Sequence, residues 1–141
     1  MWIFTKYGFF SVVCASKAPS DLRGKVLDKN VVMVRARARS HLLRLQKAYA
    51  LMPFKIHTDT GTDYAFRMIL PKKLWVEVAA ELCRDIEYGN FKDACHKATD
   101  DHTYHDALYK VWATMQGLQP GFDPVPPPAP RRVVKSRKVK K

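Results

Sequence analysis

The sequence predicts an α+β protein, in which a mostly antiparallel sheet of four to five strands carries two or three helices on one face. Short β-branched and aromatic segments lie between turns that contain glycine or proline. Later segments repeat apolar residues with helical spacing. The order along the chain is hairpin, strand, helix, hairpin, helix, helix, which favours helices packed against one side of the sheet. The centre of this order is compatible with a ferredoxin-like core.

The first half of the chain is predicted to form a hairpin, a strand and a helix. Gly8 stands between two apolar segments and supplies the positive φ that a tight hairpin turn requires. Ser40 is placed to cap the helix, with Leu42, Leu45 and Tyr49 on one face. The expected ranges are strands at 2–5 and 9–14, a polar loop at 15–30, a strand at 31–38 and a helix at 40–49.

The second half is predicted to hold another hairpin and the remaining helices. Its strands are expected at 54–58 and 64–70, with a turn at 60–63. Pro71 then opens a helix, because proline is tolerated at a helix start. A short helix is expected after Asn90 and a final one over 101–118. Their apolar faces are expected to consist of Trp75, Val78, Ala79, Leu82 and Ile86; of Phe91, Ala94, Cys95 and Ala98; and of Tyr104, Leu108, Val111, Met115 and Leu118.

Positive charge divides the chain into two parts. The 141 residues carry a formal net charge of +12. Residues 121–141 hold seven Lys/Arg and one Asp, which gives +6, and the first 120 residues hold eighteen Lys/Arg and twelve Asp/Glu, which also gives +6. The sequence predicts a compact domain over 1–119 and a proline-rich spacer with a disordered basic tail over 120–141. Proline lacks an N–H donor, and the basic run has too little apolar surface to fold.

The basic run is typical of a chain that binds a polyanion. It follows a proline-rich stretch at 124–130 and contains no carboxylate. Charge of this kind attracts nucleic acid through its long-range field. The residues expected to contact phosphates are Arg131, Arg132, Lys135, Arg137, Lys138, Lys140 and Lys141.

A strand rich in arginine suggests a second contact. Arg35 and Arg37 alternate with apolar residues, so they share one face of their strand, and Arg67 is placed similarly in another. Their planar guanidinium groups suit phosphate, so the three are expected to position the domain on nucleic acid. The alternative is an ordinary polar outer face of a sheet. Nearby aromatics could stack on unpaired bases, but alternation predicts that Tyr64 and Phe66 point away from Arg67 into the core.

Several sequence blocks resemble those of a known family. They are MWIFT and GFFSVV near the start, VRAR at 34–37, Asp63-Tyr64 with Arg67, YGNFK at 88–92 and YHDALYKVW at 104–112. Together they resemble a family of small uncharacterised bacterial and bacteriophage proteins, over most of residues 1–119. The resemblance implies a bacterial or phage cytoplasmic protein with a small domain, and it implies no activity, cofactor or catalytic residue. The spacer and basic tail look like an addition to the family pattern.

Other classes of protein find little support in the sequence. Three widely spaced cysteines do not form a disulfide framework and suggest a reducing cytoplasm. No segment approaches the roughly 20 apolar residues that span a bilayer. No phosphate-binding glycine loop, nucleophile elbow or zinc motif is present. His96, His102 and His105 are explained as surface histidines on helices. We therefore expect no enzyme, metal site, cofactor, small-molecule substrate or membrane partner.

The function expected from the sequence is non-enzymatic, electrostatic binding of DNA or RNA without strong sequence specificity. The location expected is the bacterial cytoplasm, or the host cytoplasm if the protein is phage-encoded. The alternative is a phage-encoded inhibitor or adaptor that docks on an acidic surface of a host protein. A third possibility is a minor structural component of a phage particle or ribonucleoprotein.

Overall fold

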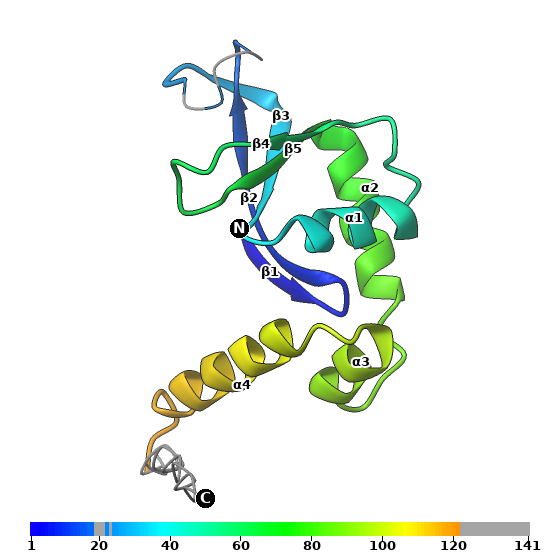
Figure 1. Cartoon of the computed structure of the whole chain (residues 1–141), viewed down its shortest axis with the longest axis vertical. Coiled ribbons are helices and arrows are strands. Elements are labelled where there is room, and N and C mark those ends of the chain that lie inside the picture. Colours follow the sequence, from blue (N-terminus) through cyan, green and yellow to red (C-terminus); the bar gives the residue numbers. More distant parts are fainter. Residues whose placement is uncertain (19–21, 23, 122–141) are drawn as a thin grey trace, which may run out of the picture. The chain divides into compact units, whose positions relative to one another are not determined.

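The computed structural model describes residues 1–18, 22 and 24–121, and Figure 1 shows how their helices and strands are arranged. The strands are β1 (Trp2–Thr5), β2 (Gly8–Ser16), β3 (Leu27–Ala36), β4 (Ile56–Thr58) and β5 (Phe66–Pro71). The helices are α1 (Arg39–Ala48), α2 (Lys72–Arg84), α3 (Phe91–Ala98) and α4 (His102–Gln116). The predicted basic tail lies outside the described residues from residue 122 onward.

The five strands form one antiparallel sheet in the order β1-β2-β3-β5-β4. Both β3 and β4 pair antiparallel with β5, which lies between them, so β3, α1 and β4 form a split βαβ unit. The predicted α+β class with an antiparallel sheet is confirmed. The central part matches the ferredoxin-like order as far as α2. The place beside β3 that a final strand would take in that arrangement is occupied by β2.

The first hairpin forms where the sequence predicts it, because its turn ends in a glycine. Gly8 has a φ of +148° and pairs with Thr5. A Cβ at this position would lie 2.6 Å from the Cβ of His41, so the turn also needs the absence of a side chain. β2 continues to Ser16 and β3 begins at Leu27, so the loop predicted at 15–30 is shorter at both ends.

Alternate side chains of the sheet form a core with α1 and α2, on what we call the inner face. Figure 1 shows both helices on the same side of the sheet. Phe10, Val34 and Met68 are completely buried there. The sheet contributes Phe10, Val12, Val32, Val34, Ala36, Met68 and Leu70 to this core, and the two helices contribute Leu42, Leu45, Trp75, Val78 and Leu82.

Two details of the helix predictions are wrong. The N-cap of α1 is Ala38, which makes no side-chain capping bond, and Ser40 lies inside the helix. Ile86 is 58% exposed, although its spacing placed it on the buried face of α2. α2 ends at Arg84, so helical spacing no longer determines where Ile86 points.

The chain divides into one unit of Met1–Asp106 and a second of Ala107–Lys141. The described part of the second unit contains most of α4 and the turn that follows it. Its apolar residues Val111, Met115 and Leu118 are 38%, 56% and 73% exposed. Their regular spacing therefore indicates one common side of the helix, but it does not show that this side is buried. Within the described ranges, no helix is both long and apolar enough to cross a membrane.

Candidate nucleic-acid interface

A row of paired residues brings two of the predicted arginines together on the outer face, which is the side of the sheet away from α1 and α2. Arg35 of β3 lies directly opposite Arg67 of β5. The row continues to Ser11 on β2 and to His57 on β4. The antiparallel register thus places two guanidinium groups side by side, as the sequence suggested. Side chains of like charge in such positions repel each other unless other groups compensate.

Arg67 is compensated by the loop between β4 and β5. Its side chain is 4% exposed, and its guanidinium contacts Asp59 at 3.1 Å and the Thr62 hydroxyl at 2.6 Å. A phosphate would have to displace these partners to reach it. The predicted role of Arg67 toward nucleic acid stays a prediction, and in this structure its guanidinium holds the loop on the outer face.

Tyr64 lies between the other two arginines. The guanidinium carbons of Arg35 and Arg37 are 4.7 and 5.0 Å from the centre of its ring, within range of cation–π attraction. The sequence predicts that Tyr64 points away from Arg67 into the core. Its burial is confirmed, with 2% of the residue exposed, but its ring lies against Arg35 and Arg37 and does not belong to the core cluster under α1 and α2. Tyr64 precedes β5 and belongs to the loop, so strand alternation does not govern its direction. Phe66, which lies within β5, packs against the inner core as predicted.

Arg35 and Arg37 are held in place by neutral groups. Arg35 Nη2 donates a hydrogen bond to Ser11 Oγ at 2.7 Å, and Arg37 Nε donates one to the backbone oxygen of Asp63 at 3.3 Å. Among the described residues, no carboxylate forms an ion pair with either guanidinium. Arg35 is half-buried and Arg37 is exposed, so the positive charge at this place is not neutralised by the surrounding chain.

Aromatic rings continue the outer face from Tyr64 toward the first hairpin. Phe9 lies 6.3 Å from Tyr64, stacks on Phe4 with ring centres 4.6 Å apart, and meets the edge of Trp2 at 5.7 Å. Trp2 is 70% exposed, and the two phenylalanines are half-buried. We call the set of Trp2, Phe4, Phe9, Arg35, Arg37 and Tyr64 the arginine–aromatic face.

Three donors on the outer face have no hydrogen-bond partner within the described part of the chain. They are Arg35 Nε, Arg67 Nε and the Tyr64 hydroxyl, all of them buried. Buried donors are normally paired, because an unpaired one costs roughly 1–3 kcal/mol. Their position beside uncompensated guanidinium groups makes this part of the sheet rich in donors and poor in acceptors.

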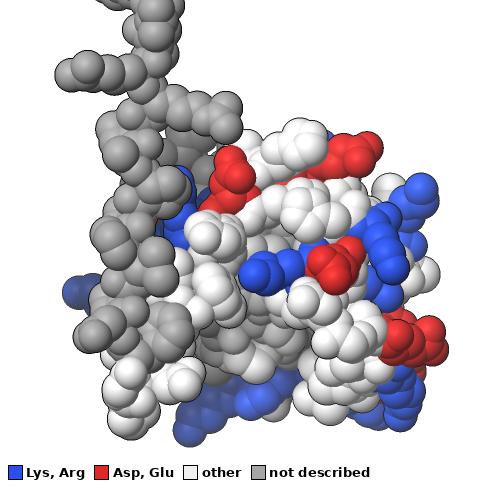
Figure 2. Space-filling model, turned by 90° about the horizontal axis from the view of Figure 1, so that it is seen from below, with Lys and Arg blue, Asp and Glu red and all other residues white. Residues whose placement is uncertain are grey.

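The face of the molecule seen from below relative to Figure 1 is mixed in charge. The face shown in Figure 2 carries Lys and Arg side chains with Asp and Glu side chains among them, separated by neutral surface. The described residues on that face form no continuous basic field. The seven predicted phosphate contacts from Arg131 to Lys141 all lie outside the described residues, so their role stays a prediction.

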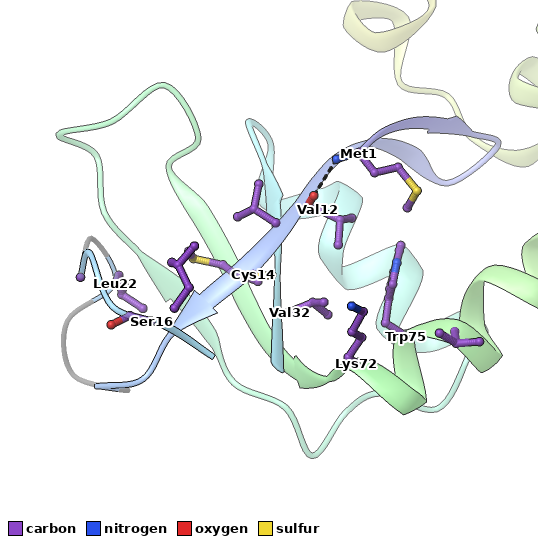
Figure 3. Close-up of a pocket in the computed structure, with 13 residues that line it drawn as sticks. Met1, Val12, Cys14, Ser16, Leu22, Val32, Lys72 and Trp75 are labelled. Atoms are coloured by element: carbon purple, nitrogen blue, oxygen red, sulfur yellow. Dashed lines mark hydrogen bonds between the residues drawn. The ribbon is translucent and has the colours of Figure 1, made fainter. Parts of the chain in front are cut away.

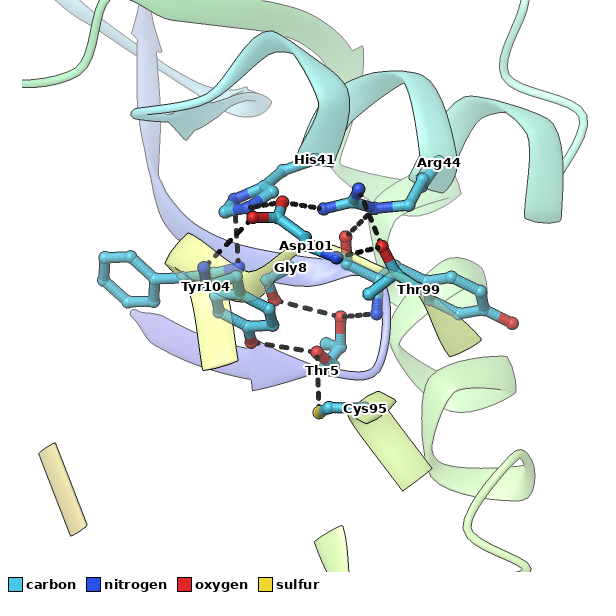
Figure 4. Close-up of polar contacts among 10 residues, drawn as sticks. Thr5, Gly8, His41, Arg44, Cys95, Thr99, Asp101 and Tyr104 are labelled. Carbon is cyan, nitrogen blue, oxygen red and sulfur yellow. Dashed lines mark hydrogen bonds and ion pairs between the residues drawn. The ribbon is translucent and has the colours of Figure 1, made fainter. Parts of the chain in front are cut away.

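A second polar cluster joins α1 to the first hairpin and to the segment before α4 (Figure 4). Asp101 accepts a hydrogen bond from Arg44 at 2.9 Å and lies 3.4 Å from His41 Nε2. The Tyr104 hydroxyl donates to the backbone oxygen of Thr5 at 2.9 Å. These bonds connect elements that are far apart in sequence, so we expect the cluster to stabilise the fold.

The His41 ring is held neutral by its surroundings. Its Nδ1 accepts the N–H of Phe9 at 3.4 Å, so the ring proton lies on Nε2 and faces Asp101. Burial, followed by the nearby Arg44 charge, lowers the pKa of His41, and the Asp101 carboxylate opposes this. Protonation at Nδ1 would remove the acceptor of the Phe9 N–H.

Cys95 supplies no nucleophile to this cluster. Its thiol is completely buried and contacts the backbone oxygen of Thr5 at 3.8 Å. Burial raises the pKa of the thiol to about 11, so it is protonated at neutral pH. The cluster therefore has no activated group of the kind that nucleophilic catalysis requires.

Asp85 is the centre of a third group of polar contacts. It accepts hydrogen bonds from the hydroxyls of Tyr49 at 2.7 Å and Tyr7 at 3.1 Å, and Lys6 lies 3.6 Å away. The Tyr49 hydrogen bond is the main cause that lowers the pKa of Asp85. The group connects the first turn with the ends of α1 and α2.

His96 in α3 and His102 and His105 at the start of α4 lie close together. His105 is only 8% exposed, so the expectation that all three are surface histidines is wrong for this residue. The rings of His96 and His105 are 3.9 Å apart, and that of His102 is 6.1 Å from His105. No group of three or more histidine, cysteine or acidic side chains in the described part is arranged to hold a metal ion.

A groove of about 680 Å³ lies beside the edge of β2, beyond the point where Met1 pairs with Val12 (Figure 3). Most of the lining that the structure describes is apolar and includes Val32 and Trp75, and Lys72 carries the one charged side chain among the described lining residues. A catalytic or cofactor pocket usually brings several polar groups together, and this lining does not.

Comparisons with known proteins found no family model, no curated protein and no solved structure that matches this chain. Function is therefore argued from the described side chains and the printed sequence.

The sequence contained part of the signal for the arginine–aromatic face. The hairpin turn at Gly8 fixes the pairing of Phe4 with Phe9, which places both rings on one side. What pattern alone could not supply was the pairing of β2 with β3 and the path of the loop that carries Tyr64.

Proposed function

We propose that the protein binds nucleic acid, through the basic segment Arg131–Lys141 and through the outer face of the sheet at Arg35 and Arg37. The observation that supports this most directly is the pair of guanidinium groups beside Tyr64, which no carboxylate of the described chain neutralises. Guanidinium groups that are fixed in place and not ion-paired are well suited to bind phosphate oxygens in pairs.

The charged residues of the sequence add long-range attraction for nucleic acid. Seven cations and no carboxylate stand in residues 131–141, and the chain as a whole carries +12. Binding of this kind depends on phosphates rather than base sequence, so weak sequence specificity is expected.

Fluorescence anisotropy with labelled duplex DNA, single-stranded DNA and RNA across a salt series tests the proposal. The native chain is compared with a full-length variant in which the seven cations from Arg131 to Lys141 are glutamine, and with a chain that ends at Gln119. We expect the native chain to bind with a log–log salt slope of roughly −0.9 per duplex phosphate contacted, and the variant to bind more weakly with a shallower slope. Absence of binding near physiological salt would contradict the proposal.

A second candidate function is docking on another protein, and α4 favours it. Tyr109, Trp112 and Met115 are 54%, 44% and 56% exposed on the second unit. Aromatic residues and methionine are enriched at protein interfaces. A basic inhibitor or adaptor that docks on an acidic host protein would place this apolar surface in the contact.

A pull-down from bacterial lysate separates the two functions. A polypeptide that stays bound after nuclease treatment and at high salt, and is lost from Trp112→Ala, would support docking on a protein. Recovery of nucleic acid alone, released by salt, would support the first proposal.

A further inference from the structure

The arginine–aromatic face carries one strongly exposed ring, that of Trp2; the rings of Phe4 and Phe9 are half-buried, and Tyr64 is buried. Trp2 is 70% exposed on the side of the sheet that α1 and α2 leave uncovered. Exposed aromatic groups beside fixed cations are more often found at binding sites than on inert surface. The ring centres of Trp2, Phe9 and Tyr64 are joined by steps of 5.7 and 6.3 Å, and Tyr64 is followed by the Arg37 guanidinium at 5.0 Å.

We propose that the arginine–aromatic face binds single-stranded nucleic acid, with unpaired bases stacked on Trp2 and the phenylalanines and the backbone phosphates at Arg37 and Arg35. This inference rests on the proposed nucleic-acid function and adds the substrate class to it. The sequence already suggested that aromatics near the arginines could stack on unpaired bases, and the structure adds which rings and arginines lie together on one face.

The aromatic rings are the reason to expect a single-stranded ligand. A base can lie on an aromatic side chain only if it is released from its own stack, and stacking of this kind tolerates any base. Duplex recognition instead uses a helix or ribbon that enters a groove. The face is part of a sheet whose packed helices α1 and α2 lie on the opposite side, so neither of these helices is placed to enter a groove beside it.

The arginines are the reason to expect an anionic ligand. Arg35 is fixed by Ser11 and by the Tyr64 ring, so its orientation is set before a ligand arrives. Arg35 Nε and the Tyr64 hydroxyl still lack acceptors within the described chain. Both of these atoms are buried, so a phosphate would be bound by the exposed Arg37 guanidinium, with which no described carboxylate forms an ion pair. Because the groups are already oriented, less side-chain freedom is lost on binding.

The basic segment and the arginine–aromatic face would make different contributions to binding. Charges in the segment attract phosphates of a duplex and of a single strand alike. Stacking on the face adds affinity for unpaired bases and for nothing else. The prediction that separates them is therefore a preference for single strands that depends on Trp2 and not on the cations of the segment.

Anisotropy with the full chain tests this, using a labelled 15-nucleotide oligo(dT) and a labelled 15-base-pair duplex. Trp2→Ala is expected to weaken oligo(dT) binding by roughly 5- to 100-fold, as expected for loss of one stacked base, and to leave duplex binding unchanged. Trp2→Phe should restore most of the affinity because a ring remains. Trp112→Ala is the matched control: it removes an exposed tryptophan outside the face and should leave oligo(dT) binding as it is.

The outcomes distinguish the two proposals. If neither ligand binds to the native chain, the proposed nucleic-acid function fails. If both bind equally well and Trp2→Ala changes neither, that function stands and the stacking site is refuted. Thermal unfolding followed by circular dichroism verifies that Trp2→Ala is folded. Quenching of tryptophan fluorescence by oligo(dT), lost in Trp2→Ala but kept in Trp112→Ala, gives a second readout that does not depend on affinity.

Discussion

Two neighbouring phenylalanines on β2 show how different the faces of the sheet are. Phe10 points to the inner face and is completely buried among core side chains. Phe9 points to the outer face and is half-buried, and its ring contacts the rings of Phe4 and Tyr64. The inner face is closed by α1 and α2, whereas the outer face is covered in part by the loop that holds Tyr64. The first face has the composition of a core, and the second combines aromatic rings with guanidinium groups.

The difference teaches which interactions each face depends on. The inner face is held by burial of apolar area, which is not directional and tolerates changes that preserve volume. The outer face is held by guanidinium–ring and guanidinium–hydroxyl contacts, in which geometry and charge matter. Substitutions of core residues on the inner face should therefore change stability, whereas substitutions of exposed outer-face groups such as Trp2 and Arg37 should change binding more than stability.

The largest expected effect tests the comparison with one substitution on each face. Phe10→Ala should lower the free energy of unfolding by about 3–5 kcal/mol, because it removes a completely buried ring and leaves a cavity. Phe9→Ala should cost about 1–2 kcal/mol, since the ring is partly exposed before the change. Urea unfolding measures both. Equal losses would contradict the assignment of the two faces.

Much of the inner face could be predicted from sequence because alternation decides it. Val34 and Met68 occupy alternate positions of apolar strands, and both are buried. The spacing of Trp75, Val78 and Leu82 likewise identified the buried side of α2. The spacing of apolar residues is a local pattern that is repeated many times along the chain. An error at one residue therefore does not change which face is predicted to be buried.

The outer face could be predicted only in part, because loops have no period. Arg35 and Arg67 were expected to share a face, and the register pairs them directly. The position of Tyr64 depends on the path of the β4–β5 loop, which pattern does not give. The partner of Arg67 is Asp59, eight residues away in the same loop. Both outer-face details follow from one segment that lies between strands.

Arg67 provides the next prediction, because it is the most buried charge of the outer face. Arg67→Gln should lower the free energy of unfolding by about 2–3 kcal/mol, since Asp59 would be left without this partner in a partly buried site. Arg84→Gln is the matched control. It removes an ion pair with Glu81 whose side chains are 69% and 52% exposed, and it should cost less than about 0.5 kcal/mol. Thermal unfolding of both variants provides the comparison.

A smaller effect concerns pH and the His41 cluster on the inner side of the hairpin. Because burial lowers the pKa of His41 in the folded protein, the unfolded chain binds a proton more readily. The stability that comes from the neutral ring is complete above the ordinary histidine pKa. It is lost as pH falls below that value through the folded pKa.

The melting temperature should accordingly fall between pH 7.5 and pH 5 in the native chain. His41→Gln should melt at a lower temperature at pH 7.5 and should lose less on acidification. Asp101 does not interfere in this range, because Arg44 and the other groups that bind its carboxylate lower its pKa against the opposing effect of burial. An unchanged pH dependence in the variant would show that His41 is not the group that titrates.

The smallest expected effect on stability belongs to Arg37, and it isolates binding from folding. Its guanidinium is exposed, bonds to one backbone oxygen and lies over Tyr64, so Arg37→Gln should change the free energy of unfolding by less than about 1 kcal/mol. If Arg37 contacts one phosphate, the same substitution should make the log–log salt slope for single-stranded DNA shallower by about 0.7. Arg37→Lys should keep the slope, because charge is retained, and lose affinity, because a lysine cannot donate two parallel hydrogen bonds. If the native chain, Arg37→Gln and Arg37→Lys all have the same salt slope, Arg37 does not contact phosphate. The outer-face guanidinium groups would then serve only to hold the β4–β5 loop in place.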